Sequence, residues 1–251
     1  MIDIHAHVLP DVDDGSDSLE TSLEMLSQAA ESGVTALVST HHCNIPGEYD
    51  NYADALLEEA FQAFSDAVKR AEPGVELFRG MEVFATPELP ELLDRGRVWT
   101  INGTAYFLTE FSFAENPYFC LDVLADCSAM GYQPIIAHPE RYYFLQDDLD
   151  LAYELCTAGY GLQINKGSLL GRFGIRAEHT ARLLLDHGLA ACVASDAHGA
   201  VQRTTYMDEV RDLLISDYGE SYMRLLLEEN PQRILQGKEL LGYEPIPFGY
   251  T

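Results

Sequence analysis

The sequence predicts an α/β fold in which about seven βα units form one distorted (β/α)7 barrel. Short apolar runs alternate with helical patterns along the chain, and several of the runs are apolar on both faces. Such two-sided runs are typical of parallel strands that helices cover. With 251 residues, the chain also has the length of a single barrel domain. We therefore expect one domain over residues 1–251, with an irregular tail from about residue 240.

Seven runs rich in Val, Ile, Leu and Phe are the expected strands. They lie around Ile2–His5, Val34–Thr40, Val75–Val83, Ala105–Phe111, Gln133–His138, Gly161–Asn165 and Ala190–Ser195. Helical patterns fill the gaps. The first begins where Asp17 and Glu20 have capping-box spacing and ends at Gly33. The later helices are expected over Tyr52–Arg70, Pro87–Asp94, Cys120–Met130, Leu149–Ala158, Ala177–His187, Arg203–Ile215 and Ser221–Glu229.

The charge balance disfavours some classes of partner. The chain has 41 acidic and 15 basic side chains, which gives a formal net charge of −26. This charge repels phosphate backbones and anionic lipids, so we expect no nucleic acid partner. No apolar run approaches the ~20 residues of a membrane span, and the N-terminus lacks a signal-peptide pattern, so no membrane insertion is expected. The five cysteines show no CxxC spacing, which favours a reducing cytoplasm.

Ionisable side chains occur at the ends of the predicted strands, where barrel enzymes carry out their chemistry. His5 and His7 follow the first strand. Residues two apart on an extended chain point to the same face, so both imidazoles can face one metal ion. Asp196 and His198 have the same spacing after the last strand. The other strand-end candidates are Asp11, Asp13 and Asp14 in the first loop, His41, His42, Glu82, Glu110 and His138.

This joint pattern predicts a metal site, although a single His or Glu would more often be structural. Mixed imidazole and carboxylate ligands suit Mn, Fe or Zn, and there are enough of them for two or three ions. A carboxylate such as Glu82 can bridge ions at the short spacing that is useful for phosphate-ester hydrolysis. We expect only one ligand from His41 and His42, because successive strand residues diverge. Asp11 and Asp13 are expected to support the loop.

These motifs together resemble the PHP (polymerase and histidinol phosphatase) superfamily. The resemblance depends on His5-Ala-His7, the Asp-Val-Asp-Asp-Gly loop, Ser39-Thr-His-His42, Glu82, Glu110, Ala137-His-Pro-Glu-Arg141 and Ser195-Asp-Ala-His198. The opening Met-Ile-Asp-Ile-His-x-His, followed by that loop, is similar to the CpsB/YwqE group. This group comprises bacterial tyrosine phosphatases of capsule and exopolysaccharide operons. The resemblance runs from residue 1 to about residue 236.

The resemblance implies a PHP domain, a TIM-like distorted barrel whose metal site lies at the C-terminal ends of the strands. It also implies three divalent ions, most commonly Mn²⁺, with Fe or Zn as alternatives. By motif position, the ligands would be His5, His7, Glu82 and Asp196 for one ion, Glu82, Glu110 and His138 for the second, and Asp14, His42 and His198 for the third. Arg141 and Arg203 match the family's phosphoryl-binding arginines and would be catalytic. Two departures are His41, beside a matched histidine, and Lys166 after Asn165.

The implied reaction is hydrolysis of phosphotyrosine by a metal-activated hydroxide. The implied partner is the tail of a membrane-associated tyrosine autokinase in capsule or exopolysaccharide regulation. None of the five cysteines has Arg six residues later, which disfavours a Cys-x5-Arg phosphatase. A histidinol-phosphate phosphatase, or another small-molecule phosphoesterase of the superfamily, remains the alternative. An amidohydrolase would usually need a carboxylated lysine at mid-chain, where the sequence has none at the right strand end. A degenerate scaffold would have lost some of the nine candidate ligands.

Overall fold

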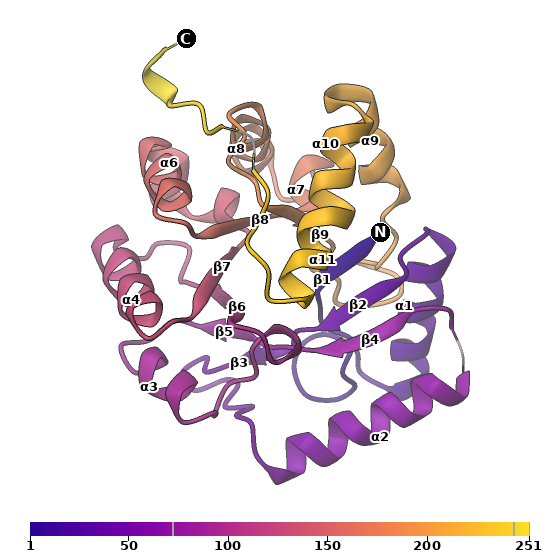
Figure 1. Cartoon of the computed structure of the whole chain (residues 1–251). Helices are drawn as coiled ribbons and strands as arrows, with labels where there is room; N and C mark the ends of the chain where they lie inside the picture. The colour runs from indigo at the N-terminus through magenta and orange to yellow at the C-terminus, as the bar shows by residue number, and fades with distance from the viewer. Residues whose placement is uncertain (72, 243, 251) are drawn as a thin grey trace.

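Short parallel strands form the centre of the molecule, and helices surround them (Figure 1). The computed structural model describes residues 1–71, 73–242 and 244–250. Within these residues the strands are β1 (Ile2–Ala6), β2 (Ala36–Ser39), β3 (His42–Cys43), β4 (Glu76–Arg79), β5 (Glu82–Phe84), β6 (Tyr106–Glu110), β7 (Gln133–Ala137), β8 (Gly161–Asn165) and β9 (Cys192–Ala194).

The strands form two sheets, ordered β1-β2-β4 and β3-β5-β6-β7-β8-β9. The predicted strand Val75–Val83 is interrupted, because β4 ends at Arg79 and β5 begins at Glu82, and the short strand β3 follows two residues after β2, beyond the end of the predicted strand Val34–Thr40. Gly80 lies between β4 and β5, where a Cβ atom would come within 2.9 Å of Val38 Cγ1. Ala6 and Ala197 form an isolated parallel bridge that links β1 to the segment after β9. This arrangement of parallel strands inside a layer of helices confirms the expected distorted (β/α)7 barrel.

The helices form the outer layer of the barrel (Figure 1). They are α1 (Leu19–Glu31), α2 (Ala55–Ala71), α3 (Leu89–Asp94), α4 (Pro117–Ala129), α5 (Tyr143–Asp147), α6 (Asp150–Thr157), α7 (Lys166–Leu169), α8 (Ile175–Asp186), α9 (Asp208–Tyr218), α10 (Glu220–Arg224) and α11 (Asn230–Leu235). A π-helical segment, Leu225–Glu229, joins α10 to α11. The predicted helix over Arg203–Ile215 was wrong at its start, because α9 begins at Asp208 and Arg203 lies in the preceding loop.

The ends of α1 show how local sequence sets a helix boundary. Ser18 is the N-cap, and its hydroxyl accepts a hydrogen bond from the Thr21 backbone N–H at 3.2 Å. The predicted cap at Asp17 was therefore one residue too early. Gly33 ends the helix as predicted, with φ of 91°. The N–H of Val34 then donates to the Ala29 carbonyl at 2.9 Å, as in a Schellman motif.

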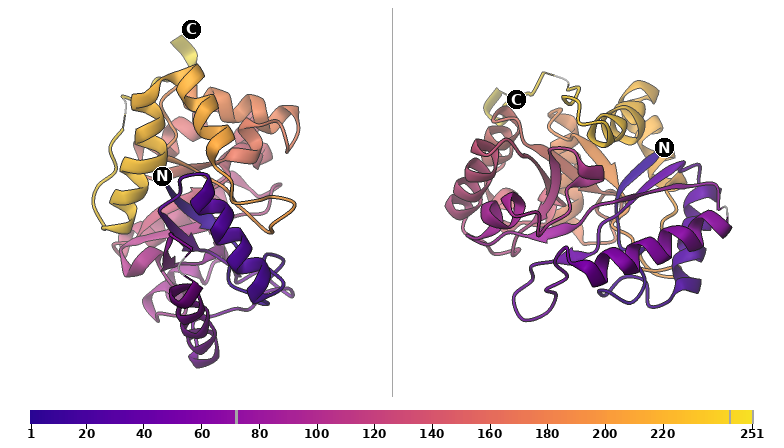
Figure 2. Two further views of the ribbon diagram at one scale, coloured as in Figure 1. Left: turned by 90° about the vertical axis from the view of Figure 1, so that its right-hand side faces the viewer. Right: turned by 60° about the horizontal axis from the view of Figure 1, so that its bottom comes forward.

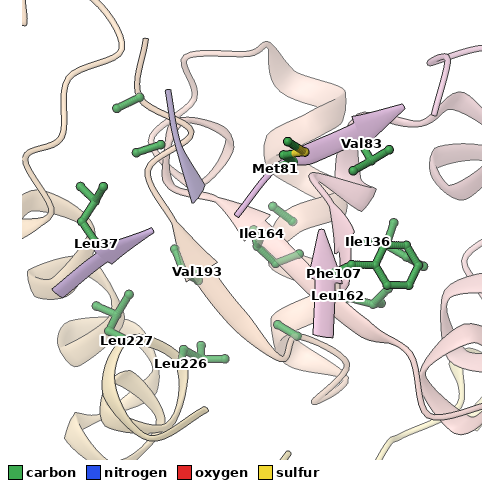
Figure 3. Packing of buried hydrophobic residues seen from close by; sticks show 14 of the residues in the cluster. Leu37, Met81, Val83, Phe107, Ile136, Leu162, Ile164, Val193, Leu226 and Leu227 are labelled. Carbon is green, nitrogen blue, oxygen red and sulfur yellow. The ribbon is translucent and has the colours of Figure 1, made fainter. Parts of the chain in front are cut away.

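Apolar side chains from the two faces of the strands form two separate clusters. In β7, Ile136 belongs to the larger cluster, whereas Ile135 and Ala137 belong to the smaller one. The larger cluster includes many helix residues, so it lies between the strands and the outer helices. Figure 3 shows part of it: Leu37, Met81, Val83, Phe107, Ile136, Leu162, Ile164, Val193, Leu226 and Leu227. The smaller cluster therefore occupies the opposite, inner face of the strands, where Ile234 of α11 also packs.

Two features lie at the edge of the barrel. Figure 2 shows α1 and α2 side by side outside the sheet that contains β2 and β4. The tail after α11 is irregular apart from a 3₁₀ turn at Phe248–Tyr250, and Tyr243 and Thr251 lie outside the described residues. The ring of Phe248 stacks on His187 at 3.9 Å, which holds the tail against the end of α8.

In the part of the chain that the structure describes, no helix has the length and apolar character needed to cross a membrane.

Candidate metal centre

The structure brings all nine predicted ligands together at the C-terminal ends of the strands. They come from β1 and the loop after it, from β3, β5 and β6, and from the segments after β7 and β9. Donor atoms of eight of them, all except His138, form three overlapping groups, and within each group the atoms lie within 4.8 Å of one another. The groups are His5, His7, Glu82 and Asp196; His42, Glu82 and Glu110; and His7, Asp14, His42 and His198.

The first group is buried and has the predicted membership. His5 Nε2 and His7 Nε2 are 3.3 Å apart, as expected for two residues that share a face of one strand. Glu82 Oε2 lies 3.2 Å from each of these nitrogens. Asp196 Oδ1 lies 3.4 Å from His5 Nε2 and 3.7 Å from His7 Nε2. The four side chains therefore converge on one point at the end of the barrel.

The second group differs from the set that the resemblance implied. His42 Nδ1 lies 3.2 Å from Glu82 Oε2 and 2.9 Å from Glu110 Oε1. The resemblance implied His138 in place of His42. His138 Nε2 lies 2.9 Å from Glu82 Oε1 and 3.8 Å from Glu110 Oε2. His138 therefore contacts the same two carboxylates from another side. Glu82 belongs to two of the groups, which is the geometry expected of a bridging carboxylate.

The third group contains the three implied residues and also His7. Asp14 Oδ1 lies 3.5 Å from both His42 Nε2 and His198 Nε2. The side chain of Asp14 is 53% exposed, so this group lies at the mouth of the site. The rings of His7 and His198 have centroids 3.8 Å apart. His41, in contrast, is buried but belongs to none of the three groups. Its ring packs edge-on against the ring of Trp99, with centroids 5.8 Å apart. The expectation that only one of His41 and His42 faces the site matches this geometry.

Buried polar atoms in this cluster fit a divalent metal ion. His42 Nδ1 and Glu110 Oε1 are close together, but both are buried and neither forms a hydrogen bond within the described residues. Buried polar atoms in proteins nearly always have a partner. Closely spaced imidazole nitrogens and carboxylate oxygens are the donor set of Mn, Fe or Zn. A metal ion would bind both atoms in place of this ion pair.

The pKa values of the cluster show strong mutual interaction. Burial opposes the charged form of His5, yet the carboxylates of Glu82 and Asp196 raise its pKa to about 9. Burial acts in the same way on His42, and Glu82 and Glu110 raise its pKa to about 10. These imidazoles outweigh burial at Glu82 and lower the pKa of its carboxyl group well below the usual range. A divalent ion would therefore displace protons from the imidazoles when it binds.

A chain of hydrogen bonds fixes which nitrogen of His5 faces the cluster. The ionised carboxylate of Asp196 can only accept, so Asn165 Nδ2 donates to its Oδ2 at 2.5 Å. Asn165 Oδ1 then accepts from Gln163 Nε2 at 2.9 Å. Gln163 Oε1 in turn accepts from His5 Nδ1 at 2.7 Å. His5 Nε2 is therefore left without a proton in the neutral ring and is free to bind a metal.

His7 is oriented in the same way by a carboxylate. Its Nδ1 donates to Asp13 Oδ2 at 2.7 Å, and the same oxygen accepts from the backbone N–H of His42 at 2.8 Å. Asp13 thus supports the first loop, as predicted, and in addition orients the ring of His7, which was not predicted. Gln163 and Asn165 were not predicted. The sequence does contain a pattern that could have indicated them: they are polar residues at alternate positions of the otherwise apolar strand β8. Residues at alternate positions of a strand lie on the same face.

Three predicted site residues have left-handed backbone conformations. The φ angles are 36° at His138, 49° at Asp196 and 48° at Arg203. Non-glycine residues adopt this region rarely, and such residues gather at functional sites when surrounding contacts hold them. The two arginines face Asp196: Arg203 Nη2 is 2.6 Å from its Oδ2, and Arg141 Nη1 is 3.7 Å from the same oxygen.

The site opens into a cleft of about 420 Å³. Both arginines line it, beside ligands from all three groups. The guanidinium of Arg141 lies between the rings of Phe113 and Phe173, at 4.5 Å and 4.6 Å, which fixes the plane of its donors. Apolar side chains form another part of the wall, namely Ile45, Phe84, Phe111 and Phe113. The cleft therefore combines positive charge, carboxylates and an apolar surface.

A barrel with such a cluster at its strand ends defines the class of metal-dependent barrel hydrolases. The chain belongs to the capsular polysaccharide synthesis family CpsB/CapC, whose model matches residues 1–236. It is 33% identical over 247 residues to the tyrosine-protein phosphatase YwqE of Bacillus subtilis, covering 98% of this chain and 96% of that protein. It is 31% identical over 241 residues to the tyrosine-protein phosphatase CpsB of Streptococcus agalactiae, covering 94% and 98%.

Solved structures agree with this membership. One similar structure comes from a study of YwqE from Bacillus subtilis and CpsB from Streptococcus pneumoniae, which are described as unique metal-dependent tyrosine phosphatases. It superposes on this chain with a TM-score of 0.90. The match has 31% identity and covers 98% of this chain and 99% of that one. A phosphotriesterase homology protein from Escherichia coli has a TM-score of 0.64 at 16% identity, with 94% and 98% coverage. This second likeness concerns the barrel fold alone.

Proposed function

We propose that the chain is a metal-dependent phosphomonoesterase that hydrolyses phosphotyrosine in proteins. The observation that carries the proposal is the cleft in which three groups of potential ligands meet two arginines. Its YwqE and CpsB relatives are named tyrosine-protein phosphatases and align along nearly their whole length. The function implied by the sequence is therefore the function that the site and the family support.

The proposed ligands are the nine residues predicted at the strand ends, and the proposed cofactor is three divalent ions. The three groups of donor atoms support this number, and their composition suits Mn²⁺, with Fe or Zn as alternatives. His138 would join the Glu82 and Glu110 carboxylates, which its ring contacts. When bound, such ions supply hydroxide from water at neutral pH and neutralise phosphoryl oxygens.

Arg141 and Arg203 would bind the phosphoryl group. A guanidinium presents planar paired donors that match phosphate oxygens, and both of these groups line the cleft. The overall charge of the chain is −26, so these arginines form a local positive region that an anionic ester needs. Each of them faces Asp196 in the structure, and a phosphoryl group would bring its own negative charge to the same donors.

The apolar wall fits an aromatic leaving group. Ile45, Phe84 and Phe111 line the same cleft as the arginines, so a phenyl ring attached to the phosphoryl group would contact them. A tyrosine hydroxyl has a pKa of about 10 and leaves without a strong general acid. We therefore assign no protein residue as the acid. The chain's own residues would orient the ester, hold its charge and shield the ring from water.

The proposed substrate protein is the tyrosine-phosphorylated tail of a membrane-associated autokinase in capsule or exopolysaccharide regulation. Family membership supports this assignment. The reaction would take place in the cytoplasm. All five cysteines are free, and four of them are buried, which suits a reducing compartment.

The test is a side-by-side assay on manganese-loaded protein. The substrates are a phosphotyrosine peptide, the matching phosphoserine peptide and histidinol phosphate, each with and without chelator. We expect chelator-sensitive turnover that favours the phosphotyrosine peptide. Preference for histidinol phosphate would keep the site and overturn the substrate. Turnover that survives complete metal removal would overturn the metal-dependent mechanism.

A further inference from the structure

Lys166 is a buried lysine that the proposed reaction does not use. It is the first residue of α7, directly after β8, and only 2% of its surface is exposed. Its ammonium group donates to two backbone carbonyls, those of Thr204 and Tyr206, the latter at 2.6 Å. Both acceptors belong to the loop of residues 199–207, between the Asp196–His198 segment and α9. Lys166 therefore connects the end of β8 to this loop.

A buried ammonium group is stable only where its donors find acceptors. Burial lowers the pKa of Lys166 to about 8, and the charge of Asp3 acts in the opposite direction. An apolar residue of similar length could fill the same space without this desolvation cost. What the lysine adds is a pair of directed hydrogen bonds to the loop. Its contribution is therefore to the position of that loop.

The loop carries Arg203 in a conformation that needs support. Its φ is 48°, and arginine adopts this region rarely. The backbone N–H of His198 donates to the Arg203 carbonyl at 2.8 Å, which closes the loop on one side. Thr204, one of the two acceptors of Lys166, is the next residue in the chain. Lys166 therefore holds the backbone beside Arg203, while the Arg203 side chain reaches Asp196.

The same junction of β8 and α7 also holds the other arginine. Glu140, which precedes Arg141, accepts hydrogen bonds from the Asn165 backbone N–H at 3.0 Å and from the Ser168 hydroxyl at 2.6 Å. The carboxylate of Glu140 thus ties the Arg141 turn to this junction. Lys166 ties the Arg203 loop to the same junction from its own side. The junction therefore sets the relative placement of both guanidinium groups.

We propose that Lys166 is a positioning residue that holds Arg203 in place for the phosphoryl group through its hydrogen bonds to the Arg203 loop. This inference rests on the proposed phosphoryl-binding role of Arg203. Lys166 does not line the cleft, so a substrate bound there would not contact it. Its removal should therefore change phosphate binding through Arg203 and leave the metal ligands unchanged.

The first experiment compares Lys166→Met with Lys69→Met, a matched control at an exposed lysine. Lys166→Met keeps an unbranched side chain that is one atom shorter, and it removes the hydrogen-bond donors. We expect kcat/KM for a phosphotyrosine peptide to fall by roughly 10- to 100-fold, the usual effect of misplacing a group that orients the substrate. The control should match the wild type, and the metal content should be equal in all three proteins. Loss of metal from Lys166→Met, or unchanged kcat/KM, would overturn the proposal.

A double variant separates positioning from a general structural effect. In an Arg203→Ala background, adding Lys166→Met should cost less than about twofold, because the group that it positions is already absent. A full and additive loss in that background would show that Lys166 acts by another route. If Lys166→Met does not fold, Lys166→Gln replaces it, since its amide keeps one donor group at a shorter reach.

Two further measurements do not depend on turnover. Backbone amides in residues 199–207 should exchange hydrogen faster in metal-loaded Lys166→Met than in the wild type or Lys69→Met. Inorganic phosphate should bind the variant more weakly, by roughly 10-fold or more. Unchanged exchange together with unchanged phosphate binding would refute the role of Lys166. If the wild type does not hydrolyse phosphotyrosine, the proposed function fails, while these two measurements still judge the role of Lys166.

Discussion

Replacing Asp13 by Asn should weaken metal binding although it leaves all nine proposed ligands in place. The side chain of Asp13 is fully buried. Its Oδ2 accepts from His7 Nδ1 at 2.7 Å and from the His42 backbone N–H at 2.8 Å, and its Oδ1 accepts from the Gly15 N–H at 3.0 Å. An asparagine has one acceptor oxygen and no charge. At least one of these donors would therefore lose its partner.

The magnitude follows from the bond to His7. A hydrogen bond to a charged group contributes about 1.5–3 kcal/mol. Each 1.4 kcal/mol is a factor of about ten in affinity, so the loss corresponds to metal binding that is roughly 10- to 150-fold weaker. This range agrees with the roughly 10- to 100-fold effects seen when the hydrogen-bond partner of a metal-binding histidine is removed. The pKa of Asp13 supports the ionised form: burial would raise it, but His7 lowers it below the usual range.

The assay is a competition titration of Mn²⁺ between the protein and a fluorescent chelator. The control is Asp11→Asn, because Asp11 is exposed and its φ of 60° is one that asparagine tolerates. The control should bind Mn²⁺ like the wild type. Saturating Mn²⁺ should restore most of the turnover of Asp13→Asn, since its ligands are intact. An affinity of Asp13→Asn within about twofold of the wild type would refute the reasoning.

Two further predictions concern the arginines and pH. Arg141→Ala and Arg203→Ala should each lower kcat by roughly 10²- to 10³-fold, as for loss of one charge-stabilising donor, with metal content unchanged; metal loss by elemental analysis would show a structural role instead. Metal-free protein should lose stability as pH rises from about 6.5 through 9 to 10. The folded-state pKa values of His5 and His42 are raised to about 9 and about 10, so their contribution is complete below the unfolded value of 6.5 and is lost above the folded values. Urea unfolding of chelator-treated protein at several pH values would measure this, and rising stability across that window would contradict it.

The strand-end residues could be predicted because two regularities coincide in the sequence. Apolar runs mark the strands, and the residues that follow them are His, Asp or Glu far too often for a purely structural role. The spacing of His5 and His7 then places both rings on one face, and the structure puts their Nε2 atoms 3.3 Å apart. The local pattern was sufficient here, because the alternation of side chains along a strand sets the face on which the residues at its end lie.

Grouping of the ligands could not be predicted from pattern, because it depends on how the strands are placed around the barrel. His7 joins a second group, and His42 takes a place beside Glu82 and Glu110 that motif position had given to His138. These assignments follow from the order and register in which neighbouring strands pair. Nothing in the order of residues along the chain encodes them directly.

The loop before α9 shows how tertiary contacts override a local signal. The residues after Arg203 have a helical pattern, but α9 begins only at Asp208. Lys166 donates to the Thr204 carbonyl, and the backbone N–H of His198 donates to the Arg203 carbonyl. These hydrogen bonds compete with the helical hydrogen bonds that the same carbonyls would accept if α9 began earlier. Lys166 is 38 residues away from Thr204 in the chain. A reading of local periodicity therefore missed the boundary.

The most direct test of the account is a crystal structure of the manganese-loaded protein with inorganic phosphate, with anomalous scattering recorded at the manganese edge. We predict anomalous peaks inside the three groups of donor atoms that share His7, His42 and Glu82. We also predict phosphate in the cleft, with its oxygens bound by Arg141 and Arg203. Peaks elsewhere, or phosphate bound away from both arginines, would contradict the central claim that this cluster is a phosphatase centre.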